Sequence, residues 1–167
     1  MMKRMGIAAT VLALGLGAAG CGDDNNGNPG GPSNTTVFTV NLLPSNENPP
    51  ITNAEQSARG TAVITVHSDT NTIDFSVSLN SFPTNSTLTA AHIHPGATGV
   101  NGTVLIGTGL TAGNAPSLAS GSATFTFTGV AETQGGQVAQ ILANPQNFYF
   151  NVHTSANPSG VMRGQLR

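Results

Sequence analysis

The sequence predicts an all-β fold, an antiparallel, Greek-key-like β-sandwich of about eight strands with one short helix. Two observations support this. Only 7% of the 167 residues are charged, and 21 glycines and 10 prolines supply many turns. Apolar and polar residues also alternate over several short segments, and this period of two is typical of half-buried strands. Turn residues separate these segments, as in a sandwich or barrel.

Residues 73–79 form the clearest predicted strand, because Ile73, Phe75, Val77 and Leu79 alternate with polar residues. Residues 69–72, directly before it, suit a hairpin turn. Strands are predicted over residues 37–43, 61–66, 73–79, 87–94, 103–107, 122–128, 147–153 and 161–166. Val138, Ile141 and Leu142 recur at helical spacing, which predicts a short helix crossing one end of the sandwich.

Charge and motifs exclude two classes of function. The formal net charge is −2, and no basic cluster follows the first few residues, so we expect no nucleic-acid partner. No glycine-rich phosphate-binding loop follows a predicted strand, which excludes the nucleotide-binding folds.

The N-terminus has the features of a secretory signal peptide over residues 1–20. Lys3 and Arg4 precede an apolar run, residues 5–19, that is shorter than the roughly 20 residues needed to cross a bilayer. The residues around Cys21, Ala-Ala-Gly-Cys, resemble the lipobox of bacterial lipoproteins, although Ala18 stands where that family usually has Leu. The resemblance implies that Cys21, the one cysteine of the chain, carries a lipid. An ordinary cleaved signal peptide is the alternative.

Residues 22–36 contain no apolar residue large enough to form a core, and we expect residues 21–36 to be a lipidated cysteine followed by a flexible tether. The domain proper is then residues 37–167. The expected location is the bacterial cell envelope, in the periplasm or at the cell surface, with the lipid on Cys21 in the membrane.

Three of the four histidines lie on two predicted strands. Side chains alternate along a strand, so His92 and His94 share one face while Ile93 lies on the other, and Leu88 and Ala90 are expected on the histidine face. In residues 147–153 an apolar trio should face the core, which turns His153 outward. We therefore expect the three imidazoles on a solvent-reachable surface or in a shallow pocket under a loop.

These histidines predict a metal site, with Glu47 as a fourth ligand. Neutral imidazoles on one sheet face suit Zn, Cu, Mn or Fe. The alternative is structural, with His92, His94 and His153 bonded to loop carbonyls. Arg163 either binds an anion near the histidines or pairs with an acid such as Glu47. The residues alone decide neither between a metal-binding and a structural role for the histidines nor between the two roles of Arg163.

Several motifs, in order, resemble the CHRD family, named after chordin. They are Asn-Glu-Asn-Pro-Pro at 46–50, Ala-His-Ile-His-Pro-Gly at 91–96, Asn-Val-His-Thr at 151–154 and Arg-Gly-Gln-Leu at 163–166. The resemblance covers residues 37–167. It implies an all-β extracytoplasmic domain, found in bacterial secreted proteins and in animal chordin, and it brings no agreed catalytic activity.

Two classes of function follow. The favoured one is a non-enzymatic binding or interaction module with a protein or glycan partner. The alternative is a metal-dependent enzyme of the cell envelope that uses His92, His94 and His153. No nucleophilic triad and no glycosidase-like carboxylate pair are recognisable, so no catalytic residue is predicted.

Overall fold

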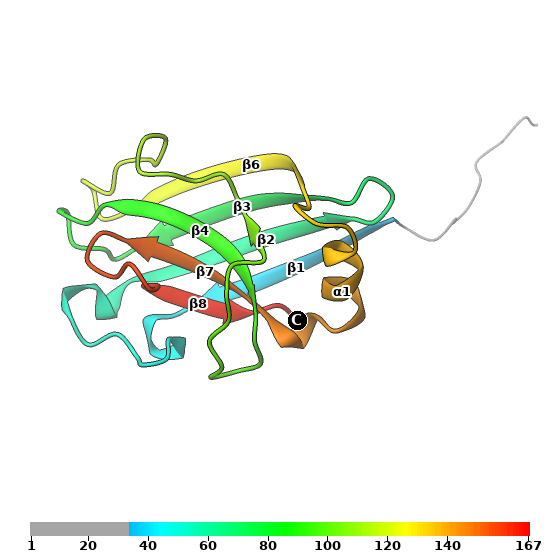
Figure 1. The fold of residues 1–167 in the computed structure, drawn as a ribbon. Helices are drawn as coiled ribbons and strands as arrows, with labels where there is room; N and C mark the ends of the chain where they lie inside the picture. The colour runs from blue at the N-terminus through cyan, green and yellow to red at the C-terminus, as the bar shows by residue number, and fades with distance from the viewer. Residues whose placement is uncertain (1–33) are drawn as a thin grey trace, which may run out of the picture. The chain divides into compact units, whose positions relative to one another are not determined.

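The computed structural model describes residues 34–167; the predicted signal peptide and Cys21 lie outside the described residues. The described chain forms two four-stranded antiparallel sheets (Figure 1). The first sheet has the order β1 (Thr35–Leu42), β2 (Arg59–His67), β3 (Thr72–Asn80) and β6 (Ala123–Ala131). The second has the order β5 (Ile106–Gly107), β4 (Leu88–Pro95), β7 (Phe148–Thr154) and β8 (Met162–Gln165). The predicted all-β sandwich is confirmed.

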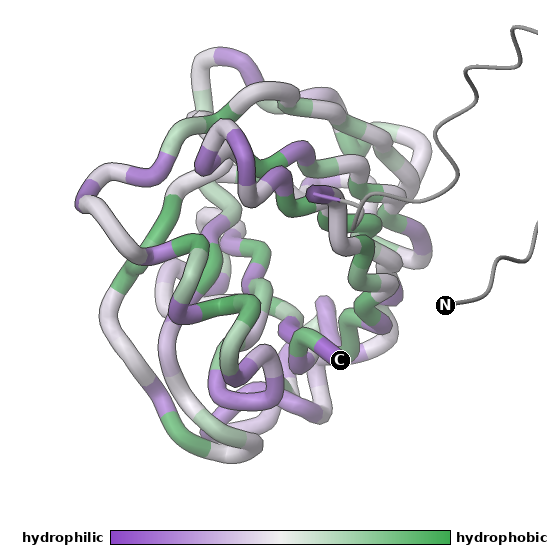
Figure 2. Tube along the Cα trace, turned by 90° about the vertical axis from the view of Figure 1, so that its right-hand side faces the viewer, coloured by the Kyte–Doolittle hydropathy of each residue, from purple (hydrophilic) through white to green (hydrophobic). Residues whose placement is uncertain are grey.

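The inner faces of the two sheets form one hydrophobic core, to which every strand of both four-stranded sheets contributes. On β3 the buried side chains alternate with polar ones, as the sequence predicts. Phe75 of β3 and Phe150 of β7 stack with ring centroids 5.7 Å apart, which joins the sheets at their centre. Figure 2 shows hydrophobic stretches, in green, and hydrophilic stretches, in purple, interspersed along the chain trace.

The predicted turn at residues 69–72 closes the hairpin between β2 and β3, where His67 pairs with Thr72. Asn71 has φ of 53°, a conformation that asparagine tolerates better than most residues.

The connection from β1 to β2 contains two short 3₁₀ helices, η1 (Pro44–Asn46) and η2 (Ala54–Ser57), that the sequence did not predict. It runs along the second sheet, since Leu43 forms a β-bridge with Arg163 and Thr154 Oγ1 donates to Glu55 Oε2 at 2.7 Å. At this junction Gly164 cannot be replaced freely, because a Cβ there would collide with the carbonyl oxygen of Asn41.

The predicted helix is α1 (Gln137–Ala143), which lies at one end of the sandwich between β6 and β7 (Figure 1). Val138 and Ile141 are buried against the core. The Glu132 carboxylate accepts hydrogen bonds from the backbone N–H groups of Gly136 at 3.0 Å and Val138 at 2.9 Å, which satisfies free donors at the start of the helix. A third 3₁₀ helix, η3 (Pro145–Asn147), leads into β7. In the described part of the chain, no helix combines the length and the apolar character required to span a bilayer.

One expectation for β4 was wrong. Leu88 was placed on the histidine face, but its side chain is buried in the core. The pairing of β4 with β7 has a register irregularity between Leu88 and Ala90. An extra residue in a strand reverses the alternation beyond it, so Leu88 faces inward while Ala90 stays on the side of the histidines.

Candidate metal centre

The three histidines meet on the outer face of the second sheet, as their alternation predicts. β4 and β7 are antiparallel neighbours, and Ala90 lies opposite His153 while His92 lies opposite Asn151. His92 and His153 are therefore diagonal neighbours across two strands. One ring nitrogen from each of His92, His94 and His153 lies within 4.8 Å of the others.

Loop carbonyls fix the orientation of two of the rings. His94 Nδ1 lies 3.1 Å from the carbonyl oxygen of Gly102, and His153 Nδ1 lies 3.1 Å from that of Pro158. A carbonyl oxygen only accepts, so both Nδ1 atoms carry the hydrogen and both Nε2 atoms present a lone pair. His153 Nε2 lies 3.1 Å from His92 Nδ1, and His94 Nε2 is buried with no hydrogen-bond partner.

These contacts fit a bound transition metal. Metal-binding histidines usually donate their second N–H to a carbonyl or carboxylate, which orients the ring. Two nitrogens at about 2.0–2.1 Å from one tetrahedral ion are a little over 3 Å apart, close to the 3.1 Å between His92 Nδ1 and His153 Nε2. Three imidazoles favour Zn or Cu, whereas Mn and Mg sites use mainly oxygen ligands.

The histidines lie under loops rather than on open surface. His94 and His153 are 6% and 7% exposed, and His92 is half-buried. The loop after β4 covers His94 through Gly102, and the loop after β7 covers His153 through Pro158. Of the two placements expected from the sequence, the structure has the one under a loop.

Burial makes the three imidazoles poor proton acceptors. It lowers the pKa of His92 to about 4, with smaller contributions from His153 and His94. Burial also lowers the pKa of His94 and that of His153, although their carbonyl partners oppose the shift. The three rings are therefore neutral at pH 7, the form that binds a metal.

These shifts predict how the stability of the metal-free protein depends on pH. Each folded-state pKa lies below the ordinary value of 6.5, so the unfolded chain binds more protons between pH 6.5 and about 4. We expect the contribution of these histidines to the free energy of unfolding to be constant above pH 6.5. As the pH falls from 6.5 towards 4, this contribution should be lost progressively. Thermal unfolding in EDTA should show a shallower decline for His92→Gln than for the wild type. Parallel profiles for the two proteins would contradict the burial of a neutral His92.

Glu47 lies apart from the imidazole cluster, which does not include it. Its Oε2 is 3.9 Å from Arg163 Nε, and both side chains are buried. Burial raises the pKa of Glu47 to about 7, while the positive charge of Arg163 acts in the opposite direction. The structure thus places Glu47 in an ion pair.

Arg163 is held by several acceptors at once. Its Nε donates to the Asn46 carbonyl at 2.7 Å and its Nη1 to Asn101 Oδ1 at 2.8 Å. The guanidinium lies 4.6 Å from the centre of the Tyr149 ring, a cation–π contact. The same ring stacks on His94 with centroids 5.0 Å apart and planes within 5° of parallel. Tyr149 therefore connects the ion pair to the histidine cluster.

Sequence reasoning missed Asn151, which lies between His92 and Arg163 in the sheet register. The available signal was its position two residues before His153, on the same face of β7. The alternative in which the histidines bond to loop carbonyls is met for His94 and His153. The sequence could not single out Gly102 and Pro158, because every residue type carries a backbone oxygen.

The fold is an all-β sandwich, and three histidines cluster on the outer face of its second sheet. These two features together characterise the class of protein. The chain matches the CHRD domain family over residues 38–166, and it belongs to that family. No curated protein and no solved structure is similar enough to this chain to count as a match.

Proposed function

We propose that this chain is an exported, lipid-anchored binding module of the bacterial cell envelope, with a metal ion held by His92, His94 and His153. Family membership supports a binding or interaction module. The lipobox-like sequence ending at Cys21 supports export and anchoring. The histidine cluster supports the metal.

The convergence of three imidazoles around the buried, unpartnered Nε2 of His94 carries the metal assignment. Loop carbonyls orient two of the rings, those of His94 and His153. Each carbonyl belongs to a loop that lies over the outer face of the second sheet. A metal on the opposite nitrogen of each ring would fix the rings and, through them, both loops. The ion would stiffen the surface that meets a partner, a structural role that requires no reaction.

Metal content tests this proposal directly. The chain, purified without a histidine tag and incubated with Zn, Cu, Mn or Fe in turn, should retain about one ion per molecule by elemental analysis after dialysis. The double variant His92→Ala/His94→Ala should retain none. His67→Ala is the matched control, because His67 pairs with Asp74 at 3.0 Å and lies outside the cluster. Absence of metal in the wild type under all four conditions would refute the site.

A metal-dependent enzyme is the second candidate, and one observation favours it. Three protein ligands leave a coordination position open, as in catalytic zinc sites. His94 also lines a cavity that contains Glu47, whose pKa of about 7 suits proton transfer. Metal-dependent hydrolytic or redox turnover that is lost in His92→Ala/His94→Ala would support this candidate over a structural ion.

A further inference from the structure

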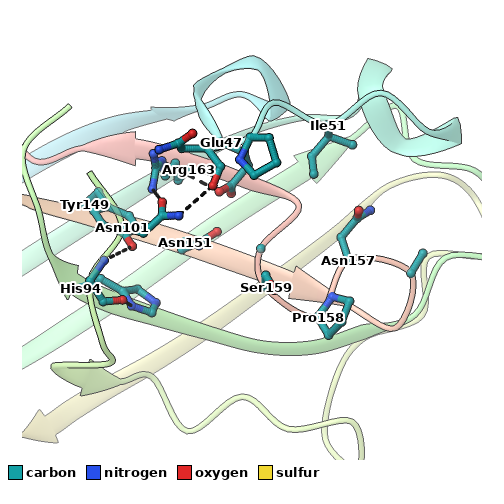
Figure 3. A pocket seen from close by; sticks show the side chains of 15 residues that line it. Glu47, Ile51, His94, Asn101, Tyr149, Asn151, Asn157, Pro158, Ser159 and Arg163 are labelled. Carbon is teal, nitrogen blue, oxygen red and sulfur yellow. Dashed lines mark hydrogen bonds and ion pairs between the residues drawn. The ribbon is translucent and has the colours of Figure 1, made fainter. Parts of the chain in front are cut away.

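A cavity of about 460 Å³ lies beside the metal centre. Its floor is the outer face of β7 and β8, and the segment after β1 and the loop after β7 form its walls. Figure 3 shows Glu47 and Arg163 at one side and Pro158 and Ser159 at the other. The volume falls within the range of small-molecule binding sites, roughly 300–1,000 Å³.

Most of the buried polar side-chain atoms that lack a hydrogen-bond partner in the described chain belong to residues that line this cavity. Five such side-chain atoms occur in residues 34–167, and four of them belong to residues that line this cavity. His94 Nε2 is explained by the metal centre. The other three are Glu47 Oε1, Asn151 Oδ1 and Arg163 Nη2, on side chains that are 7%, 2% and 3% exposed.

Unsatisfied buried polar groups are costly, each by about 1–3 kcal/mol and more when charged, and they call for an explanation. The three atoms require complementary partners. Arg163 Nη2 has hydrogens to donate, whereas Glu47 Oε1 and Asn151 Oδ1 have lone pairs to accept with. A ligand that both accepts and donates hydrogen bonds would satisfy all of them.

The ion pair selects against charged ligands. Because Glu47 and Arg163 are 3.9 Å apart, a carboxylate brought to the arginine would also meet the glutamate. An ammonium group brought to the glutamate would likewise meet the arginine. A neutral hydroxyl group avoids both repulsions, since one O–H donates and accepts. Ile51, Pro49 and Pro158 in the lining offer apolar surface for the C–H groups that lie between hydroxyls.

We propose that this cavity binds a neutral saccharide, with hydroxyl groups bridging Arg163, Glu47 and Asn151. This inference deepens the proposed binding function and rests on it, because it assigns the ligand class of the module. It does not require the metal, although His94 and Tyr149 border both sites.

Ligand-observed NMR tests the inference with the full chain in a detergent that lacks a sugar head group. The probes are glucose, galactose, mannose, N-acetylglucosamine, maltose and cellobiose, with methylammonium and acetate as charged comparisons. We expect saturation transfer to at least one sugar and none to methylammonium or acetate. Binding of methylammonium or acetate in place of sugars would overturn the assigned ligand class, and binding of no probe would overturn the site.

Two tyrosine variants locate the binding. Ser159 is exposed and lines the cavity, so Ser159→Tyr should fill the opening without disturbing the core and weaken sugar binding by about tenfold or more. The control, Ser76→Tyr, lies on an exposed position of β3 in the other sheet and should bind like the wild type. Equal affinity of the Ser159→Tyr variant and the wild type would overturn the location.

Metal analysis of the same samples separates the two proposals. A chain that retains metal but binds no sugar overturns the saccharide site alone. A chain that binds a sugar at this cavity but retains no metal supports the saccharide site and overturns the metal centre alone.

Discussion

Phe150→Ala is expected to lower the free energy of unfolding by about 3–5 kcal/mol. Phe150 is fully buried on the core face of β7 and stacks on Phe75 of the opposite sheet. Truncation removes the ring's transfer free energy and leaves a cavity between two sheets whose backbones are fixed by their ladders, so the void cannot close completely. Because natural domains of this size are stable by only about 5–15 kcal/mol, the loss would be a large fraction of the total.

Urea unfolding followed by circular dichroism measures this effect. Val37→Ala is the control, since Val37 lies on β1 with its side chain 57% exposed, and the change should be within about 0.5 kcal/mol. A loss below about 1 kcal/mol for Phe150→Ala would mean that the two sheets do not pack through this residue.

The strands could be predicted because one face of each meets the core. The alternation at Ile73, Phe75 and Val77 places β3 almost to the residue. The two edge strands of the second sheet were predicted less well. The strand predicted over residues 103–107 is observed only as β5 (Ile106–Gly107), and the strand predicted over residues 161–166 is observed as β8 (Met162–Gln165). Apolar residues continue beyond the ladder there, since Val161 and Leu166 are buried without belonging to the strand. Both residues still donate backbone hydrogen bonds to β7, Val161 to the carbonyl of Val152 at 2.8 Å and Leu166 to that of Phe148 at 3.0 Å, so the predicted segment matches the paired and buried chain rather than the regular strand alone.

The site was predictable where it follows strand geometry and not where it depends on loops. Alternation places His92 and His94 on one face of β4 and His153 on the outer face of β7, and the pairing of β4 with β7 brings the three together. The position of Glu47 depends on the path of the segment after β1, where η1 and the bridge from Leu43 to Arg163 set the direction of the chain. No period in the sequence encodes that path. The burial of His94 and His153 has the same origin, because the loops that cover them bond through backbone carbonyls.

The second sheet differs from an ordinary sandwich sheet because its outer face is buried as well. Every residue of β7 is buried, and alternate positions on its outer side carry Tyr149, Asn151 and His153. A purely structural outer face would be solvated or apolar. Instead, polar groups are kept from water under two loops, and several lack partners. This arrangement is the physical basis on which we propose both the metal centre and the saccharide cavity.

Cys21→Ser is expected to abolish lipid attachment completely. If residues 1–20 are a lipoprotein signal, the wild-type chain made in a bacterial host should begin at Cys21 and carry the added mass of its lipid. It should also enter the detergent phase on detergent phase separation, since each buried methylene contributes about 0.8 kcal/mol and two acyl chains give a stable anchor. The variant should carry no lipid mass and should retain residues 1–20, because lipid-dependent cleavage is lost. Intact-mass spectrometry reads both properties.

The double variant Cys21→Ser/Gly22→Cys is the matched control, since it keeps one cysteine but moves it by one residue, and it should also lack lipid. A wild-type chain that is cleaved but unlipidated would establish the ordinary signal peptide instead.

The outcome also constrains where the chain can meet its ligand. β1 begins at Thr35, so the chain from Cys21 reaches at most about 50 Å when fully extended. A lipidated chain must therefore find its ligand close to the membrane surface, which favours saccharides of the envelope itself over freely diffusing ones.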